Sequence, residues 1–349
     1  MIRSRMGKRF LRGGVITRKI QFPHTYQDII SVENLLLAWK EFLKGKRKKA
    51  DVQEFQFNLM GNILELHQNL KQKTYRHGGY QHFKVNDPKP RDIHKASVRD
   101  RLLHHALYRQ LYSFFERTFI ADSYSCRLGK GTHKAMNRFR QFAYQVSKNH
   151  TRTCFVLKCD IRKFFASIDQ PILLEILSSY IPNLDILSLL AEIVGSFHSS
   201  KPGKGLPLGN LTSQLLTNIY MNEFDQFVKH QLKVKHYLRY ADDFIILLHQ
   251  EGQLIEIVRY IALFLRKQLK LELHPDKVFI QTFASGVDFL GWVHFKDHRV
   301  LRTASRRRMF RRVLSPSAKL ESLQSYLGLL SHGNANKLQR TIEVLINRK

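Results

Sequence analysis

The sequence has few of the features that mark secreted, membrane-bound or zinc-stabilised proteins. Its 349 residues include only 3 cysteines, which form no C-x-x-C pair; this suits a reducing compartment and argues against structural zinc. It contains no run of about 18 uncharged apolar residues, so no transmembrane helix is expected. The arginine-rich start also lacks the apolar core of a secretory signal. These absences predict a cytoplasmic protein with no membrane partner.

Acidic residues are scarce as well. The chain has 28 Asp and Glu against 58 Lys and Arg, which gives a formal net charge of +30. The excess is largest at the two ends, because residues 1–50 and residues 296–349 each hold 13 Lys and Arg against 3 Asp and Glu. A charge of this size indicates a polyanionic partner and favours nucleic acid over a membrane surface. Both ends are therefore expected to be basic arms.

Two of the few acidic residues are adjacent and lie between apolar runs. The stretch 236–249, HYLRYADDFIILLH, predicts two short strands that meet at a polar turn carrying Asp242 and Asp243. The apolar return strand indicates a buried sheet, where uncompensated carboxylates are costly, so a counter-cation is implied. Carboxylate oxygens favour a hard divalent cation. For this pair alone, a solvated turn is the alternative interpretation.

A second predicted strand also ends in aspartate. Residues 154–160, CFVLKCD, predict a buried strand followed by a tight turn into a helix, so Asp160 adds a third carboxylate beside the hairpin tip. Three carboxylates can hold two Mg²⁺ ions about 3.5–4 Å apart, the arrangement by which polymerases activate a 3′ hydroxyl and stabilise the leaving pyrophosphate. The pattern therefore predicts a nucleotidyl transferase.

These segments resemble the motifs of reverse transcriptases. Tyr240-Ala241-Asp242-Asp243 resembles their YxDD box, and Asp160 with Phe164-Phe165 resembles their first palm motif. The resemblance covers about residues 75–295 and implies an α+β right-hand polymerase fold with helical fingers, a palm of antiparallel sheet backed by helices, and a short helical thumb. It further implies that Asp160, Asp242 and Asp243 bind two Mg²⁺ ions, with Mn²⁺ as a substitute and the Ile161 carbonyl as a further ligand.

The expected fingers and palm follow from the same resemblance, whereas the two end segments rest on charge and helical spacing alone. The expected divisions are a basic N-terminal arm with helices (1–74), fingers (75–152), a palm (153–295, with a fingers insertion at about 172–204) and a basic thumb (296–349). Apolar residues at helical spacing predict helices over 32–43, 55–70, 172–180, 212–232 and 254–269. Six histidines at positions 67–105 lack cysteine or paired acidic companions, so core or RNA-facing roles are favoured over a metal site.

The resemblance also assigns roles around the incoming nucleotide. Arg91 lies in a segment that resembles the fingers motif and is expected to clamp the triphosphate, because its planar fork can pair with phosphate bidentately; Lys84 is a second candidate. Phe165 matches the steric-gate position that excludes a ribose 2′ hydroxyl, with core packing as the alternative. Lys277 matches the lysine of the fourth palm motif, which protonates the leaving pyrophosphate; an exposed turn lysine is the alternative interpretation.

Two further boxes concern the primer and the nascent base pair. Phe289-Leu290-Gly291-Trp292 resembles the primer-grip box, so Leu290, Gly291 and Trp292, with Tyr240, are expected to contact primer and template. Gly205-Leu206-Pro207-Leu208-Gly209 resembles the box over the nascent base pair, where most reverse transcriptases carry Gln instead of Leu208. Leu208, Gly209 and Gln214 are therefore added as nucleotide-binding candidates.

The continuation 209–214, GNLTSQ, resembles the box of reverse transcriptases from diversity-generating retroelements. That resemblance implies a bacterial, archaeal or prophage-encoded enzyme that copies a template-repeat RNA from dNTPs with errors opposite adenine, holds the cDNA/RNA duplex, and works with a small basic accessory variability protein. A retron, an antiphage enzyme and a free-standing intron-derived enzyme are alternatives within the class. An RNA-binding scaffold without catalysis is the alternative outside it, which three intact carboxylates disfavour.

Overall fold

The computed structural model describes residues 19–86, 90–315 and 319–347, and the chain divides into two compact units. The first comprises the described residues up to Ala121 together with Ile161–Lys233 and Ile261–Glu272. The second comprises Asp122–Asp160, Val234–Tyr260 and the described residues from Leu273 onwards. Both units contain helices and strands, as the predicted α+β class requires. Residues 1–18 of the predicted basic arm lie outside the described residues.

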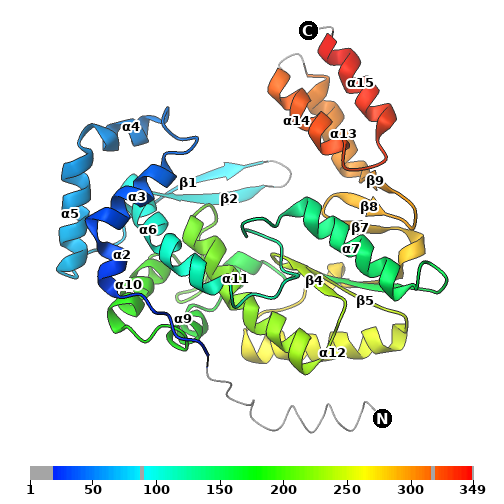
Figure 1. Cartoon of the computed structure of the whole chain (residues 1–349), viewed down its shortest axis with the longest axis horizontal. Coiled ribbons are helices and arrows are strands. Elements are labelled where there is room, and N and C mark those ends of the chain that lie inside the picture. The colour runs from blue at the N-terminus through cyan, green and yellow to red at the C-terminus, as the bar shows by residue number, and fades with distance from the viewer. Residues whose placement is uncertain (1–18, 87–89, 316–318, 348–349) are drawn as a thin grey trace. The chain divides into compact units, whose positions relative to one another are not determined.

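The first unit is mainly helical. Helix α6 (Val98–Phe115) packs against both α3 (Val32–Phe42) and α11 (Leu211–Gln226), as Figure 1 shows. Ser97 caps the start of α6, because its hydroxyl accepts a hydrogen bond from the Asp100 amide. The other helices of this unit are α2 (Tyr26–Ile30), α4 (Ala50–Phe57), α5 (Leu59–Lys71), α8 (Phe164–Ser167), α9 (Gln170–Ser178) and α10 (Leu184–Gly195).

Most predicted helices are present, but the single helix predicted over 55–70 is wrong. The chain forms α4 and α5 instead, which are separated at Asn58 with φ −118° and ψ 48°. The Asn62 side chain donates a 2.9 Å hydrogen bond to the Phe55 carbonyl, so a side chain satisfies a carbonyl at the end of α4. The helix predicted over 212–232 is α11 followed by a π-helical turn, Phe227–Gln231.

The two strands described in the first unit form a hairpin. Strand β1 (Tyr80–Val85) pairs antiparallel with β2 (Arg91–Ala96), in a register that runs from Tyr80↔Ala96 to Val85↔Arg91. The base of this hairpin is fixed to the helices, because the Tyr80 hydroxyl lies 2.7 Å from the Ser196 hydroxyl. The outer part of β1 is exposed and therefore free to face a ligand.

The second unit is built on a four-stranded antiparallel sheet of order β4-β5-β3-β6. Helix α7 (Thr132–Val146) lies against β4 and β5 (Figure 1). The strands are β3 (Phe155–Cys159), β4 (Tyr237–Tyr240), β5 (Asp243–Leu248) and β6 (Phe279–Thr282), and α12 (Glu251–Gln268), which continues into the first unit, follows β5. The predicted strands at 154–160 and 236–249 and the helix at 254–269 are thereby confirmed.

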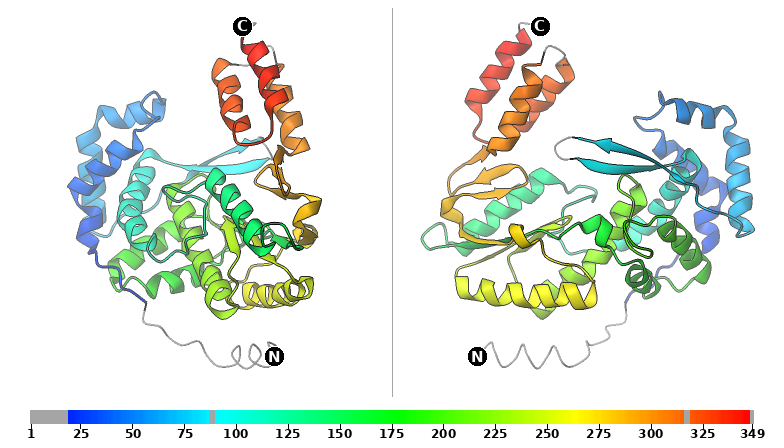
Figure 2. Two further views of the ribbon diagram at one scale, coloured as in Figure 1. Left: turned by 45° about the vertical axis from the view of Figure 1, so that its right-hand side comes forward. Right: turned by 180° about the vertical axis from the view of Figure 1, so that it is seen from behind.

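A second sheet and three helices complete this unit. The sheet has the order β7-β8-β9, with β7 (Val287–Phe289), β8 (Trp292–His294) and β9 (Arg299–Leu301). Helices α13 (Thr303–Val313), α14 (Leu320–Leu330) and α15 (Asn336–Asn347) follow it and lie side by side (Figure 2). One apolar cluster joins α7, both sheets and these helices. No helix within the described ranges is long and apolar enough to cross a membrane.

Candidate active site

The adjacent aspartates stand at the tip of a tight hairpin. Tyr240 pairs with Asp243, so only Ala241 and Asp242 form the loop. Ala241 has φ 56°, and a two-residue hairpin loop of either favoured type needs a positive φ at this first position. The buried Arg239 guanidinium donates a 3.0 Å hydrogen bond to the Ala241 carbonyl and thereby holds the turn in place.

The strand register brings Asp160 to the same place. Cys159 at the end of β3 pairs with Phe244 on β5, so Asp160, which directly follows β3, comes opposite Asp243. Alternation along the strands sets Lys158, Asp160, Tyr240 and Asp243 on one face of the sheet. The Asp160 carbonyl accepts a 2.8 Å hydrogen bond from the His274 amide, which holds this strand end in position. The convergence of two strand ends inferred from sequence is thus present in the second unit.

The Asp243 carboxylate is strongly perturbed by its surroundings. Burial raises its pKa from 3.8 to about 6; Lys158 opposes the shift, while the charges of Asp160, Asp242 and Asp288 add to it. One of its oxygens, Oδ1, is buried without a hydrogen-bond partner among the described residues. A buried carboxylate oxygen that lacks a donor is costly, and it creates a demand for a cation.

Two lysine ammonium groups partly compensate the negative charge of these carboxylates. Lys277 Nζ lies 3.0 Å from Asp160 Oδ1, so the lysine expected from the fourth palm motif does lie beside the carboxylates. Lys158 Nζ lies 3.9 Å from Asp243 Oδ2 and donates a 2.8 Å hydrogen bond to the Asp288 carbonyl. Sequence reasoning missed Lys158. Its position two residues before Asp160 on the same strand was the available signal, because such residues share a face.

The donor set suits a hard divalent cation. Its side chains offer carboxylate oxygens alone, and Asp243 Oδ1 is an unsatisfied oxygen of this kind. In the described part of the chain, however, no three His, Cys, Asp or Glu side chains converge closely enough to hold a metal ion. The ammonium groups of Lys158 and Lys277 stand against Asp243 and Asp160. The carboxylates therefore fit a metal in chemistry, and binding it requires these side chains to rearrange.

A second strained turn lies in the three-stranded sheet. Phe289 pairs with Trp292, so Leu290 and Gly291 form the loop between β7 and β8, with φ 52° and φ 86°. Two consecutive positive φ values define the type I′ hairpin turn, in which leucine at the first position is unfavourable. Trp292 is buried, whereas Leu290 and Gly291 are partly exposed. Two of the predicted primer-grip residues, Leu290 and Gly291, thus form a strained turn, and Trp292 follows it as the first residue of β8.

Comparison with known families decides the identity of this chain. The family model described as "Reverse transcriptase (RNA-dependent DNA polymerase)" matches residues 84–294, more than half of the 349 residues. The chain belongs to the reverse transcriptase family. The matched region contains all three aspartates and the Leu290-Gly291 turn.

Individual relatives of this reverse transcriptase are distant. Protein YkfC of Escherichia coli (strain K12) is 25% identical over 256 residues, covering 62% of this chain and 65% of that protein. Group II intron-encoded protein LtrA of Lactococcus lactis subsp. cremoris is 23% identical over 331 residues, covering 74% of this chain and 53% of that protein. The chain therefore spans between about half and two thirds of these curated relatives.

The predicted nucleotide-binding residues of the reverse transcriptase lie in the first unit. Leu208 is fixed by its backbone, because its carbonyl accepts a 3.0 Å hydrogen bond from the His94 amide of β2. The Asn210 side chain donates a 2.9 Å hydrogen bond to the His94 carbonyl. Gly209 has φ 109°, and a Cβ there would lie 2.9 Å from Ile93 Cγ2, so only glycine allows this close approach. The box at 205–210 and the β1–β2 hairpin are thereby held together.

The remaining candidates differ in their exposure. Arg91 and Lys84 lie at the outer end of the hairpin and are exposed, as phosphate-binding side chains must be. Gln214 is half-buried on the first turn of α11. Phe164 is buried, whereas its neighbour Phe165 is only partly buried. Phe164 therefore belongs to the core, whereas the Phe165 ring remains partly accessible.

The histidines of the 67–105 segment differ in burial. His104 is fully buried, its Nε2 lies 3.2 Å from His77 Nε2, and burial lowers its pKa to about 3. His82 lies on the exposed hairpin 2.9 Å from Asp92. A neutral buried His104 supports the core interpretation for that residue.

Proposed function

We propose that this chain is an RNA-directed DNA polymerase. The observation that carries the proposal is the meeting of Asp160 with the Asp242-Asp243 hairpin tip at adjacent strand ends, within the region that matches the reverse transcriptase family. In the reaction, the 3′ oxygen of a DNA primer bonds to the α-phosphorus of a dNTP on an RNA template. The bond from that phosphorus to the bridging oxygen breaks, pyrophosphate leaves, and the 3′ hydroxyl loses its proton.

The proposed architecture is the right-hand polymerase fold. In it, 75–152 with an insertion at about 172–204 forms the fingers, 153–295 the palm and 296–349 the thumb. The antiparallel sheet that carries the aspartates supports the palm assignment, and three consecutive helices, the first of them strongly basic, support the thumb. The proposed palm contributes residues to both compact units.

We assign the metal-binding role to Asp160, Asp242, Asp243 and the Ile161 carbonyl, with two Mg²⁺ ions as the cofactor and Mn²⁺ as a substitute. Bound there, the ions would lower the pKa of the primer hydroxyl and neutralise the leaving pyrophosphate. Lys277, 3.0 Å from Asp160, is suited to donate a proton to the pyrophosphate once the cation replaces it at that carboxylate. Arg91 and Lys84 bind the triphosphate, and Phe165 limits the space for a 2′ hydroxyl. Tyr240 and the turn at 290–292 contact the primer end.

Primer extension on an RNA template tests this proposal. The variant with Asp242→Ala and Asp243→Ala should lose cDNA synthesis while binding template RNA as tightly as the parent. Asp297→Asn is a matched control, since Asp297 is exposed on the β8–β9 loop and its side chain makes no described contact. Undiminished extension by the double variant would contradict the polymerase assignment.

The finer biological role rests on residues 208–214. Leu208, in place of the usual glutamine, and the GNLTSQ box support a role in a diversity-generating retroelement, with a template-repeat RNA as substrate and a small basic accessory protein as partner. A paired template repeat and variable repeat beside the gene would support this role. Intron-encoded relatives favour the second candidate, a free-standing intron-derived enzyme, for which the flanking DNA would carry no such repeats.

A further inference from the structure

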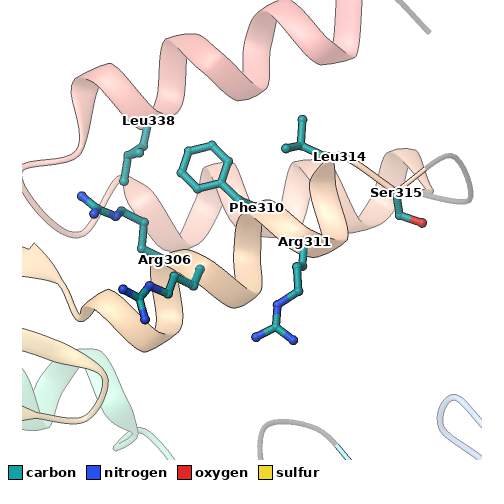
Figure 3. A pocket seen from close by; sticks show the side chains of 7 residues that line it. Arg306, Phe310, Arg311, Leu314, Ser315 and Leu338 are labelled. Atoms are coloured by element: carbon teal, nitrogen blue, oxygen red, sulfur yellow. The ribbon is translucent and has the colours of Figure 1, made fainter.

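A hollow in the C-terminal helical segment combines strong positive charge with an apolar floor. It has a volume of about 890 Å³ and lies between α13 and α15, within the second unit. Phe310 points into it, with Leu338 and Leu314 on either side, and the Arg311 side chain, which also lines it, extends in a different direction from the Phe310 ring (Figure 3). The lining used in the following argument is Arg306, Arg307, Arg311, Phe310, Leu314 and Leu338.

The arginines of the hollow have no carboxylate partner within the described ranges. Arg306, Arg307 and Arg311 are exposed, and none forms an ion pair with any described carboxylate. The described residues that line the hollow include no acidic one, and α13 itself, TASRRRMFRRV, contains none. Arg307 and Arg311 are spaced i, i+4 and Arg306 adjoins Arg307, so these like charges on one helix repel one another and the arrangement is unfavourable without an anion. The charge complementarity therefore points to a polyanionic occupant.

The apolar floor distinguishes between forms of nucleic acid. Leu314 is 62% exposed, and Phe310 and Leu338 are partly exposed, although they border the apolar core of this unit. A duplex presents phosphates and groove edges but hides the faces of its bases. An unstacked base offers a π-face to an aromatic ring or a guanidinium, with a phosphate on either side of it. The Phe310 ring and two leucines, surrounded by arginines, match an unstacked base with its flanking phosphates.

We propose that this hollow binds an unpaired nucleotide of single-stranded RNA, with the base against Phe310 and Leu338 and the flanking phosphates on Arg306, Arg307 and Arg311. Identifying that RNA as the enzyme's template rests on the proposed function; the binding site itself does not. The site would hold a single-stranded part of the template while the carboxylates act on the primer end.

Fluorescence anisotropy with labelled oligouridylate tests the site in the full chain. Phe310→Ala should weaken binding about 5- to 100-fold, the range expected when one stacked base loses its aromatic partner. Phe310→Tyr should restore binding, whereas Phe310→Leu, which keeps an apolar side chain but lacks the ring, should not. A blunt RNA duplex of equal length should bind all four proteins within about twofold. Thermal melts identify any variant that is merely unfolded.

The arginines are tested by salt dependence. Replacing Arg306 and Arg311 with Ala should reduce the slope of log affinity against log salt by about 0.7 for each phosphate that the variant no longer neutralises. Arg340→Ala is the matched control, since Arg340 is exposed on α15 but does not line the hollow, and its slope should match the parent's.

The outcomes separate this proposal from its rivals. Equal weakening of oligouridylate and duplex by Phe310→Ala would overturn it, as would equal weakening of an abasic strand, which has phosphates but no bases. Retained RNA binding by all variants would leave an acidic protein partner as the ligand and would also overturn it. If primer extension works while the hollow variants bind RNA normally, this inference fails and the proposed function stands. If the parent protein fails to extend a primer while the Phe310 substitutions weaken RNA binding as expected, the proposed function fails and this inference stands.

Discussion

Replacing Asp243 with asparagine should stabilise the protein when no metal is bound, even though it removes a proposed catalytic group. The folded state raises the pKa of this carboxyl from 3.8 to about 6, chiefly through burial. At about 1.36 kcal/mol for each pH unit between these values, the ionised side chain destabilises the fold by about 3 kcal/mol. Because the side chain remains 24% exposed, this figure is an upper limit. Asparagine keeps the shape and removes the charge.

The effect has a defined pH window. A carboxyl whose folded pKa lies above its ordinary value costs nothing below pH 3.8, where it is protonated in both states. The penalty grows as pH rises towards about 6 and is complete above it. In EDTA near neutral pH, Asp243→Asn should therefore raise the melting temperature by roughly 4 °C, if all 349 residues unfold together. At about pH 4 the two proteins should melt alike.

Added Mg²⁺ should reverse this order. A cation that binds only the folded parent stabilises it by mass action, whereas the asparagine variant gains less because it has lost a ligand. Melting curves of both proteins, and of the exposed-site control Asp297→Asn, in EDTA and in Mg²⁺ measure the effect. A variant that is less stable than the parent in EDTA at neutral pH, or a stability difference that does not change with pH, would refute the reasoning.

Three further predictions concern single residues. Phe165→Ala should admit ribonucleotides with little loss of deoxynucleotide use, reducing sugar discrimination by roughly 1–3 kcal/mol; parallel losses of both in steady-state kinetics would show that Phe165 is core. Leu208→Gln should lower misincorporation opposite template adenine, because glutamine can hydrogen-bond around the incoming sugar; sequencing cDNA from one template decides it, and an unaltered error spectrum with activity retained rejects it. Gly333→Ala should destabilise the second unit by roughly 1–3 kcal/mol in urea unfolding, since its Cβ would lie 2.0 Å from a Trp292 ring carbon; wild-type stability would mean that this loop moves freely.

The sequence was most informative where the spacing of apolar residues agreed with the residues that end a strand or helix. Apolar runs on either side of Asp242-Asp243 and before Asp160 located the three strands β3, β4 and β5 within a residue or two, and the helical stripe at 254–269 located α12. The stripe at 55–70 misled, because a backbone break at Asn58 leaves apolar spacing almost unchanged. Periodicity reports which side chains face the core, and it is insensitive to a single residue that leaves the helical region.

The charged groups that surround Asp243 were not predicted from the sequence, for a different reason. The need for a counter-cation at the hairpin tip was inferred, but its present source, Lys158, comes from a strand about eighty residues earlier. Asp288, which also raises the pKa of Asp243, comes from β7 in the other sheet and belongs to no recognisable motif. Strand alternation could have placed Lys158 on the face of Asp160. Its approach to Asp243 and the contribution of Asp288 depend on tertiary contacts, which leave no local pattern.

Two hairpin tips in the second unit hold a strained backbone, and one of them carries the adjacent aspartates. Ala241 and Leu290 both hold a positive φ without being glycine, and each such residue costs of order 1–3 kcal/mol. Both turns close strands whose other residues lie in one apolar cluster shared by α7, the two sheets and the C-terminal helices. That core can hold the turns in conformations that the isolated loops would not adopt. The carboxylates of Asp242 and Asp243 are thus presented by a rigid backbone, and only their side chains and the lysines beside them need to move when a cation binds.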